Sequence, residues 1–344
     1  MLISLQKAFK VKEVRDRLLY TFMMLVVIRI GCCLPIPGVD PSYLHDFFSN
    51  LQSSGMGFFN AITGGSFSSM SIFALSITPY ITSSIIMQLL TIAIPKLEEM
   101  QKDGEDGRKK IAEYTRYLTV GLALFESCAM AVGLGGKGLL LEDHRNVWGY
   151  LTVVAAMTAG SALLMWIGER ITDNGVGNGI SIVLLINIVS GTPQDMMTLY
   201  ERFMAGKSVA VATVACIIVL AIIIAIFVFV IILNDAERRI PVQYSKKMQG
   251  RRMIGGQSTY IPLKVNTANV IPVIFASSIM SMPVMIAQFF HVDYSTIGGK
   301  ILLALSSSNW FKPEAPAYSI GLLVYIVLVV LFAYFYTSIT FNPL

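Results

Sequence analysis

The sequence has few charged residues, and its cysteines and histidines are not arranged as a cross-link or a metal site would need. Only 14% of its 344 residues are charged, whereas 55% are hydrophobic. The four cysteines all lie in apolar segments, as small buried hydrophobic residues do, and do not suggest a disulfide framework. The three histidines occur singly. The sequence therefore predicts neither a disulfide-stabilised domain nor a metal site, and it indicates no cofactor.

The few charges are clustered, and they leave uncharged windows long enough to cross a bilayer, which takes about 20 apolar residues. We therefore expect an all-α polytopic membrane protein rather than a soluble domain. Residues 1–17 alternate apolar and basic side chains, which is typical of a helix in the cytoplasmic headgroup layer. A signal peptide is the alternative, but it lacks a cleavage site. Eight spans are expected, at residues 18–34, 71–94, 117–136, 147–168, 176–193, 208–233, 265–290 and 315–340.

The distribution of basic residues orients these spans. With the N-terminus inside, nineteen of the 26 lysines and arginines fall in inner segments and six in outer loops, while Arg29 lies within the first span. Basic residues accumulate on the cytoplasmic side of membrane proteins. Both ends of the chain are therefore predicted to be cytoplasmic.

Two spans are poorly suited to facing lipid on every side. No charge occurs between residues 47 and 95, yet the second span follows Gly64 and Gly65 and contains a proline and many hydroxyl groups. The seventh span contains Pro272 and Pro283 with three serines between them. Two interrupted polar helices favour a pathway through the bundle, although small residues also permit close helix packing.

A single acidic residue, Glu126, lies in the middle of the third span, where ionisable side chains are costly and often functional. It suits either a polar contact with Thr82 or Gln88 of the second span, or the coupling residue of a secondary transporter. The absence of further mid-membrane carboxylates counts against a proton-driven pump. The glycines of 168–181 match no phosphate-binding motif and indicate a tight turn into the fifth span.

The inner loop at residues 234–265 carries more basic residues than orientation requires. Its QYSKKM and STYIPLKV runs are expected to form a hairpin that turns at Gln249-Gly250. A projecting basic hairpin suits a polyanion or an acidic protein face; contact with anionic lipid is the alternative. The basic residues are Arg238, Arg239, Lys246, Lys247, Arg251 and Arg252.

Three long blocks resemble the SecY family, which comprises the channel subunits of bacterial protein translocons. SIFALSITPYITSSIIMQLL (71–90) resembles the second-helix signature of that family, and MWIGERITDNGVGNGISIVLLI (165–186) resembles its fifth-helix signature. The segment at 238–278, with RRIPVQYSKKMQGRRMIGGQSTYIPLKVN and VIPVIFASS, is similar to its cytosolic loop and seventh helix. The resemblance implies an inverted-repeat helical bundle with a plug and a lateral gate.

The same resemblance implies roles for individual residues. A constricting pore ring would fall on Ile77, Ile81, Ile180, Leu184 and Ile274. A plug of about residues 57–70 would include Phe58, Phe59, Asn60, Ile62, Gly64, Gly65 and Phe67, held by weak, glycine-rich packing. A lateral gate between the second and seventh helices would involve Thr82, Ser83, Gln88, Glu126, Ser277 and Ser278.

The implied function is a passive channel that moves unfolded preproteins across the bacterial plasma membrane and releases membrane segments sideways into it. It would have no catalytic activity and no small-molecule substrate. The implied partners are SecE, SecG, the motor SecA, the ribosome, preproteins with signal sequences and anionic lipid. The basic loop would be the docking site that SecA and the ribosome share.

Two features depart from the family pattern. Ser76 stands where the second-helix block usually has glycine, and it is expected to stiffen the joint between plug and helix. The sequence also stops after the eighth of ten family helices, which suggests a shortened chain. On this basis the N-terminal half is expected at residues 1–193. The incomplete C-terminal half would occupy residues 194–344 and hold helices six to eight.

Overall fold

The computed structural model describes residues 10–40, 63–135, 138, 140–141, 145–242, 247–249, 252–254, 259–268, 270–289, 296–306, 309–310 and 316–340. This part of the chain is mostly helical, as its apolar composition predicts. It divides into two compact units. The first comprises Met1–Pro193 and Ser277–Ile326, and the second comprises Gln194–Ala276 and Val327–Leu344.

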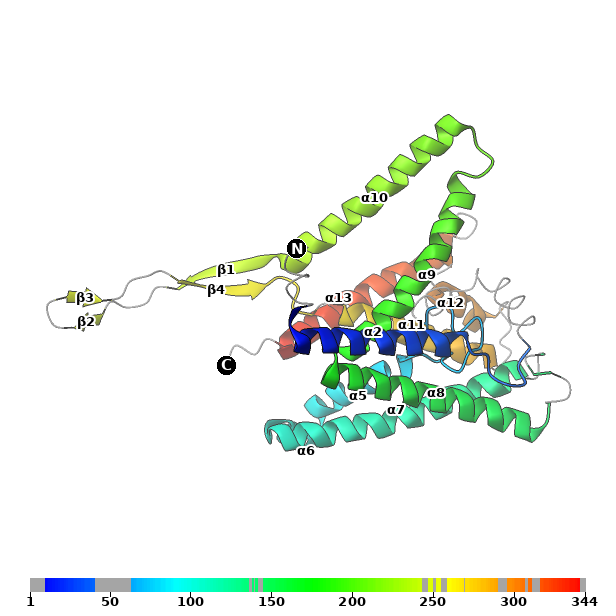
Figure 1. The fold of residues 1–344 in the computed structure, drawn as a ribbon, viewed down its shortest axis with the longest axis horizontal. Helices are drawn as coiled ribbons and strands as arrows, with labels where there is room; N and C mark the ends of the chain where they lie inside the picture. The colour runs from blue at the N-terminus through cyan, green and yellow to red at the C-terminus, as the bar shows by residue number, and fades with distance from the viewer. Residues whose placement is uncertain are drawn as a thin grey trace. The chain divides into compact units, whose positions relative to one another are not determined.

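Each of the eight predicted spans contains a helix (Figure 1). Within the described residues, α8, α9, α10 and the segment Pro316–Ser338 are each long and apolar enough to cross a membrane, and the bent pair α5–α6 adds a fifth candidate. The chain is therefore a multi-pass membrane protein. The eight helices are α2 (Lys12–Cys33), α5 (Thr78–Ala93), α7 (Glu105–Leu134), α8 (Val147–Asn174), α9 (Gly179–Phe203), α10 (Val209–Asp235), α11 (Ile271–Phe289) and α13 (Ile320–Thr340).

The first helix differs from the prediction at its start. Helix α2 runs without a break from Lys12 to Cys33, so Lys12, Arg15 and Arg17 belong to the same helix as the first span. Lys10 lies before a bend at Val11, so the predicted surface segment is separated from α2 at residue 11 rather than at residue 17. Residues 1–9 lie outside the described part of the chain.

The second span is shorter than predicted, because residues 72–77 form turns and α5 begins only at Thr78. Pro79 consequently lies in the first turn of α5, where its missing N–H group costs no hydrogen bond. Helix α5 has 16 residues and is about 24 Å long. It ends at Ala93, and the chain bends by 102° at Ile94 into α6 (Pro95–Lys102).

A tight turn joins α8 to α9, as the glycines predict. Helix α8 ends at Asn174 and α9 begins at Gly179. The Gly179 N–H group donates a 2.9 Å hydrogen bond to Thr172 Oγ1, and a Cβ atom at this position would overlap the carbonyl group of Gly168. Glycine is therefore required where the two helices meet. Thr21 of α2 accepts a hydrogen bond from the Val176 N–H group at 3.1 Å and ties α2 to the same turn.

Two apolar cores stabilise the first unit. In one of them, the packing involves the turn region, which is defined here as residues 64–77. Its Phe67, Met70 and Leu75 pack against residues of α7 and α8. In the other, Ile28 of α2 and Ile77 pack against residues of α8 and α9. Helices α5, α7 and α8 lie side by side around these cores (Figure 1). Elsewhere in this unit, α12 (Ile297–Leu305) contacts the short helix η4 (Pro316–Ser319).

In the second unit, α10 has no buried residue, and its isoleucine, valine and phenylalanine side chains are exposed as lipid-facing residues would be. Phe275 of α11 stacks on Phe332 of α13, with ring centroids 5.2 Å apart. The predicted hairpin follows α10 (Figure 1). It consists of β1 (Glu237–Val242) paired with β4 (Thr259–Lys264) and of β2 (Lys247–Gln249) paired with β3 (Arg252–Ile254), both antiparallel.

The turn of this hairpin lies where the sequence predicts it, because Gln249 pairs with Arg252 across residues 250–251. The partner of the STYIPLKV run was predicted wrongly. Strand β4 pairs with β1, the ERRIPV segment, rather than with QYSKKM. Ile240 and Ile261 are opposite each other in this pair, so β-branched side chains of both strands meet.

Candidate functional site

Four of the five residues predicted for the pore ring belong to one apolar cluster in the first unit. Ile77 precedes α5 and is fully buried, while Ile81 of α5 and Ile180 and Leu184 of α9 are partly buried around it. A methyl group built on Gly168 would lie 3.5 Å from Ile77 Cδ1 and 3.4 Å from Ile180 Cγ1. The two side chains therefore meet over a glycine of α8.

The fifth ring candidate, Ile274, lies in α11 within the second unit. Its own helix begins at Ile271, directly before Pro272. Ile274 is partly buried within the described part of the chain.

The described end of the predicted plug is well packed. Phe67 and Met70 are fully buried in the core formed with α7 and α8. The prediction of weak packing is therefore wrong for residues 63–70. Gly64 and Gly65 have φ angles of +65° and +80°, which glycine adopts without strain. The remaining plug candidates, Phe58, Phe59, Asn60 and Ile62, lie outside the described residues.

Main-chain hydrogen bonds join this turn region to the segment after α2. The Ile36 N–H group donates to the Met70 carbonyl at 3.1 Å, and the Ile72 N–H group donates to the Leu34 carbonyl at 3.0 Å. Pro35 and Ser71 form an isolated antiparallel bridge between these bonds. The turn region is thus held in place by main-chain hydrogen bonds to the segment after α2 as well as by the packing of Phe67 in the core.

The joint between the turn region and α5 is made by Ser76. This residue is fully buried and has a φ angle of +53°, in the region that favours glycine. The Asn187 side-chain amide of α9 donates a 2.9 Å hydrogen bond to its hydroxyl. Asn187 was not among the residues predicted for the site. Its position as the one polar side chain in the run 182–189, one turn beyond Leu184, is the pattern that could have revealed it.

Two of the three predicted gate residues of α5 form side-chain hydrogen bonds within their own helix. The Thr82 hydroxyl donates to the Thr78 carbonyl at 3.1 Å, and the Ser83 hydroxyl donates to the Pro79 carbonyl at 2.8 Å. Gln88 is exposed. Such bonds satisfy a hydroxyl group without a partner helix.

The other gate candidates lie on α7 and α11. Glu126 Oε2 is buried, and it has no hydrogen-bond partner among the described residues. The Thr82 hydroxyl, suggested as its partner, donates within α5 and so does not donate to Glu126. The Ser277 hydroxyl lies 3.5 Å from the Tyr325 hydroxyl of α13. Ser278 follows it in α11 and is partly buried.

An ion pair joins α7 to α8 outside the ring cluster. Arg116 Nε donates to Glu169 Oε1 over 2.7 Å. This hydrogen bond raises the pKa of the Arg116 guanidinium above its ordinary value, so the guanidinium keeps its charge.

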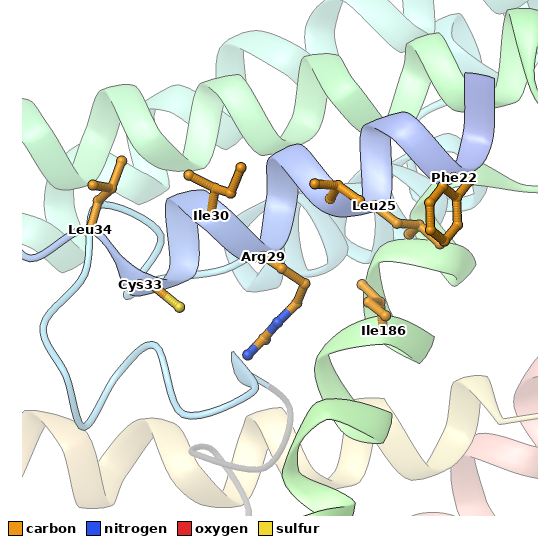
Figure 2. Close-up of a pocket in the computed structure, with 8 residues that line it drawn as sticks. Phe22, Leu25, Arg29, Ile30, Cys33, Leu34 and Ile186 are labelled. Atoms are coloured by element: carbon orange, nitrogen blue, oxygen red, sulfur yellow. The ribbon is translucent and has the colours of Figure 1, made fainter. Parts of the chain in front are cut away.

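A pocket of about 480 Å³ lies between α2 and α9. Its lining is apolar except for Arg29, which projects from α2 on the side of Cys33, and Ile186 faces it from α9 (Figure 2). The Arg29 guanidinium donates a 2.8 Å hydrogen bond to the Ser190 hydroxyl of α9. This hydrogen bond therefore holds the Arg29 guanidinium against α9.

Two of the six predicted docking residues lie in β1. Arg238 and Arg239 are exposed, and the Arg239 guanidinium lies 4.8 Å from the ring centroid of Tyr260 in β4. Lys247 and Arg252 are the first residues of β2 and β3. Lys246 and Arg251 lie outside the described residues. Within the described chain, no three His, Cys, Asp or Glu side chains could hold a metal ion together.

Comparison with known proteins identifies the family. The SecY family model matches residues 71–344. The protein translocase subunit SecY of Streptomyces scabiei is 42% identical over 355 aligned residues, which cover 100% of this chain and 78% of that protein.

Solved structures share the fold. One of them concerns the plug domain of the SecY protein and has a TM-score of 0.59 at 18% identity. The alignment covers 94% of this chain and 72% of that chain. Sec61 in the canine ribosome–channel complex has a TM-score of 0.58 at 19% identity, over 96% and 74% of the two chains. The chain matches the family model over most of its length and a curated member over all of it, so it belongs to the SecY family.

Proposed function

We propose that this protein is the central pore-forming subunit of a protein-conducting channel. The observation that carries the proposal is the cluster of Ile77, Ile81, Ile180 and Leu184, which gathers ring candidates from two helices next to the predicted plug. Family membership supports the same role, because the relatives are protein translocase subunits. Their role is that of a channel rather than of a catalytic enzyme.

The apolar character of this cluster suits an unfolded polypeptide as cargo. A conduit that every sequence must pass cannot rely on specific polar contacts. Flexible isoleucine and leucine side chains fit around a moving chain without binding it, and they exclude water and ions at the narrowest point. Ile274 completes this collar in the proposal, from the C-terminal half of residues 194–344.

The plug proposal covers about residues 57–70, and its support is the glycine conformation at Gly64 and Gly65. In the proposal, the segment before Phe67 leaves the pore while Phe67 itself stays anchored in its core. The lateral gate is proposed between α5 and α11. The hydroxyls of Thr82 and Ser83 support it, because they donate to carbonyl groups of α5 and so need no acceptor on a facing helix.

The basic hairpin is the proposed docking site for the ribosome and for SecA. Its support is the exposure of Arg238 and Arg239 on β1, together with the strand pairing that projects them. The energy for transport comes from these partners, since the proposed channel carries out no reaction itself. SecE and SecG complete the complex, and anionic lipid surrounds it in the bacterial plasma membrane, with both ends of this chain in the cytoplasm.

Site-specific crosslinking tests the function. Cysteine is introduced at Ile81 or Ile274 in a chain that keeps none of the native cysteines, and a secretory chain with a single cysteine is stalled in transit. A mild added oxidant then joins thiols that lie close together as a disulfide. Both positions are expected to crosslink. A matched control keeps only the native Cys216, which is exposed on α10 and should not react with the stalled chain. If neither ring position crosslinks while the stalled chain is inserted, the proposed pore is wrong.

A further inference from the structure

A chain of hydrogen bonds crosses the cluster that holds the ring residues. Arg29 of α2 donates to Ser190 at 2.8 Å, and the Ser190 hydroxyl donates to the Asn187 carbonyl at 2.6 Å. The Asn187 amide donates to the Ser76 hydroxyl at 2.9 Å. The Ser161 hydroxyl of α8 then donates to the Ser76 carbonyl at 3.3 Å. Side chains of α2, α8 and α9 thereby converge on the residue before Ile77.

Asn187 occupies the face of α9 that carries the ring candidates. Residues spaced by four and seven positions share one face of a helix, and Ile180, Leu184 and Asn187 have this spacing. On the opposing side, Ser76 directly precedes Ile77. The hydrogen bond between Asn187 and Ser76 therefore spans the same interface as the apolar ring.

Asn187 also contacts the described end of the plug. A Cβ atom at Gly64 would lie 2.8 Å from the Asn187 carbonyl oxygen and 3.0 Å from its Cα atom. The turn that begins the described plug region thus packs against the backbone of Asn187. Asn187 of α9 therefore contacts both Gly64 in the plug-side turn and Ser76 at the start of α5.

The conformation of Ser76 makes this bond consequential. A non-glycine residue with a φ angle of +53° is strained, and such strain persists only where the surroundings enforce it. Two neighbouring helices enforce it here, through the Ser76 hydroxyl and the Ser76 carbonyl. If α5 moves away from α9, the bond breaks and Ser76 is released from its strained conformation.

We propose that Asn187 is a positioning residue that latches the ring and the plug-side turn in the closed arrangement. This inference rests on the proposed channel function and assigns a closing contact within it. Losing the latch removes a stabilising interaction from the closed state alone, so the equilibrium shifts toward open channels. The latch is weak enough to release, because Asn187 Oδ1 is buried with no hydrogen-bond partner among the described residues.

Resting ion conductance of the complete channel complex in planar bilayers tests the latch. Asn187→Leu keeps the branched shape of the side chain and removes its donor, and Ser76→Ala keeps the strained backbone and removes the acceptor. Each is expected to raise the resting open probability by about three- to tenfold, the effect of one interhelical hydrogen bond within a membrane. The double variant should conduct no more than the Asn187→Leu variant, because both substitutions break one bond.

Ser127→Ala is the matched control. It removes the 2.9 Å hydrogen bond between Ser127 of α7 and Thr158 of α8, which lies between helices that bring no ring residue. We expect it to lower thermal stability as much as Asn187→Leu does and to leave resting conductance unchanged. Conductance that rises equally in the control would mean a purely structural role for Asn187.

The outcomes separate this inference from the function on which it rests. If the wild-type complex translocates a preprotein and the Asn187→Leu and Ser76→Ala complexes are as tightly closed as wild type, the latch is wrong and the channel stands. If the fold-increase in resting conductance of the double variant equals the product of the two single-variant increases, the residues do not act through their shared hydrogen bond. If wild-type complexes that contain every partner move no preprotein, the proposed function itself fails.

Discussion

The aromatic ring of Phe73 lies directly on Gly31 of α2, so closely that a Cβ atom at residue 31 would overlap it. Phe73 is buried in the cluster that also holds Ile77. The absence of a side chain at residue 31 is therefore a packing requirement. Through it, α2 fixes the turn region that leads to the ring.

We expect Gly31→Val to destabilise the protein by about 1–3 kcal/mol, the usual cost of overpacking a core. The added methyl groups must displace Phe73, and the turn region moves with it. Thermal unfolding of the purified complex measures the change. Gly121→Val on α7 is the control, since a Cβ atom at residue 121 meets nothing within 4 Å. Equal loss of stability in the two variants would contradict the packing argument.

The glycines of the plug-side turn provide a second matched pair. Gly64 and Gly65 both have positive φ angles, but a Cβ atom would clash with Asn187 only at Gly64 and would meet nothing within 4 Å at Gly65. Gly64→Ala is therefore expected to raise resting ion conductance about threefold or more, because it combines backbone strain with displacement from α9. Gly65→Ala carries the strain alone and should stay closer to wild type. The reverse order of the two conductances would overturn this explanation.

The ion pair between Arg116 and Glu169 joins α7 to α8 at 2.7 Å. Arg116→Ala is expected to reduce stability by about 0.5–1 kcal/mol, since the arginine is half exposed and solvent screens the attraction. The swapped pair, Arg116→Glu with Glu169→Arg, should recover part of the loss. Chemical denaturation in detergent measures both. If the swapped pair loses more stability than the two single variants lose together, the residues around the pair determine which charge each position tolerates.

The basic hairpin predicts a salt-dependent interaction. Reversing charge at Arg238 and Arg239 is expected to weaken ribosome binding by about tenfold or more and to flatten its dependence on salt, because fewer phosphate counterions are released. Cosedimentation at several salt concentrations measures both effects. Lys207→Glu with Lys300→Glu is the control, since it makes the same change in net charge at segments predicted to lie outside. Identical losses in both pairs would indicate a net-charge effect rather than a docking surface.

The positions of the helices could be predicted from the sequence, because runs such as Val209–Asp235 leave no other fold that satisfies their backbone in lipid. The start of α5 could not. Apolarity continues from residue 71, but the positive φ angles of Met70 and Ser76 keep the chain in turns until Thr78. These angles depend on contacts with α8 and α9, which no local pattern encodes.

The candidate site was predictable to a similar extent. The resemblance placed Ile77, Ile81, Ile180 and Leu184 in one ring, and the structure brings these four into one cluster. It also marked Ser76 as a departure, and stiffness at this joint remains a prediction. Asn187 was overlooked because one amide in an apolar run of a helix indicates a role only once its partner is known. The strand partner of β4 was missed because ERRIPV reads as a charged segment rather than as a strand.

The backbone bridge between Pro35 and Ser71 bears on how this region can evolve. Hydrogen bonds between main-chain atoms do not depend on the identity of the side chains that the two segments carry. The exposed side chains of Leu34 and Pro35 can therefore vary without detaching the segments, whereas Ile36 and Met70 are constrained by the core in which they are buried. Sequence change at these exposed positions can then proceed while the main-chain attachment between the turn region and the segment after α2 is inherited unchanged.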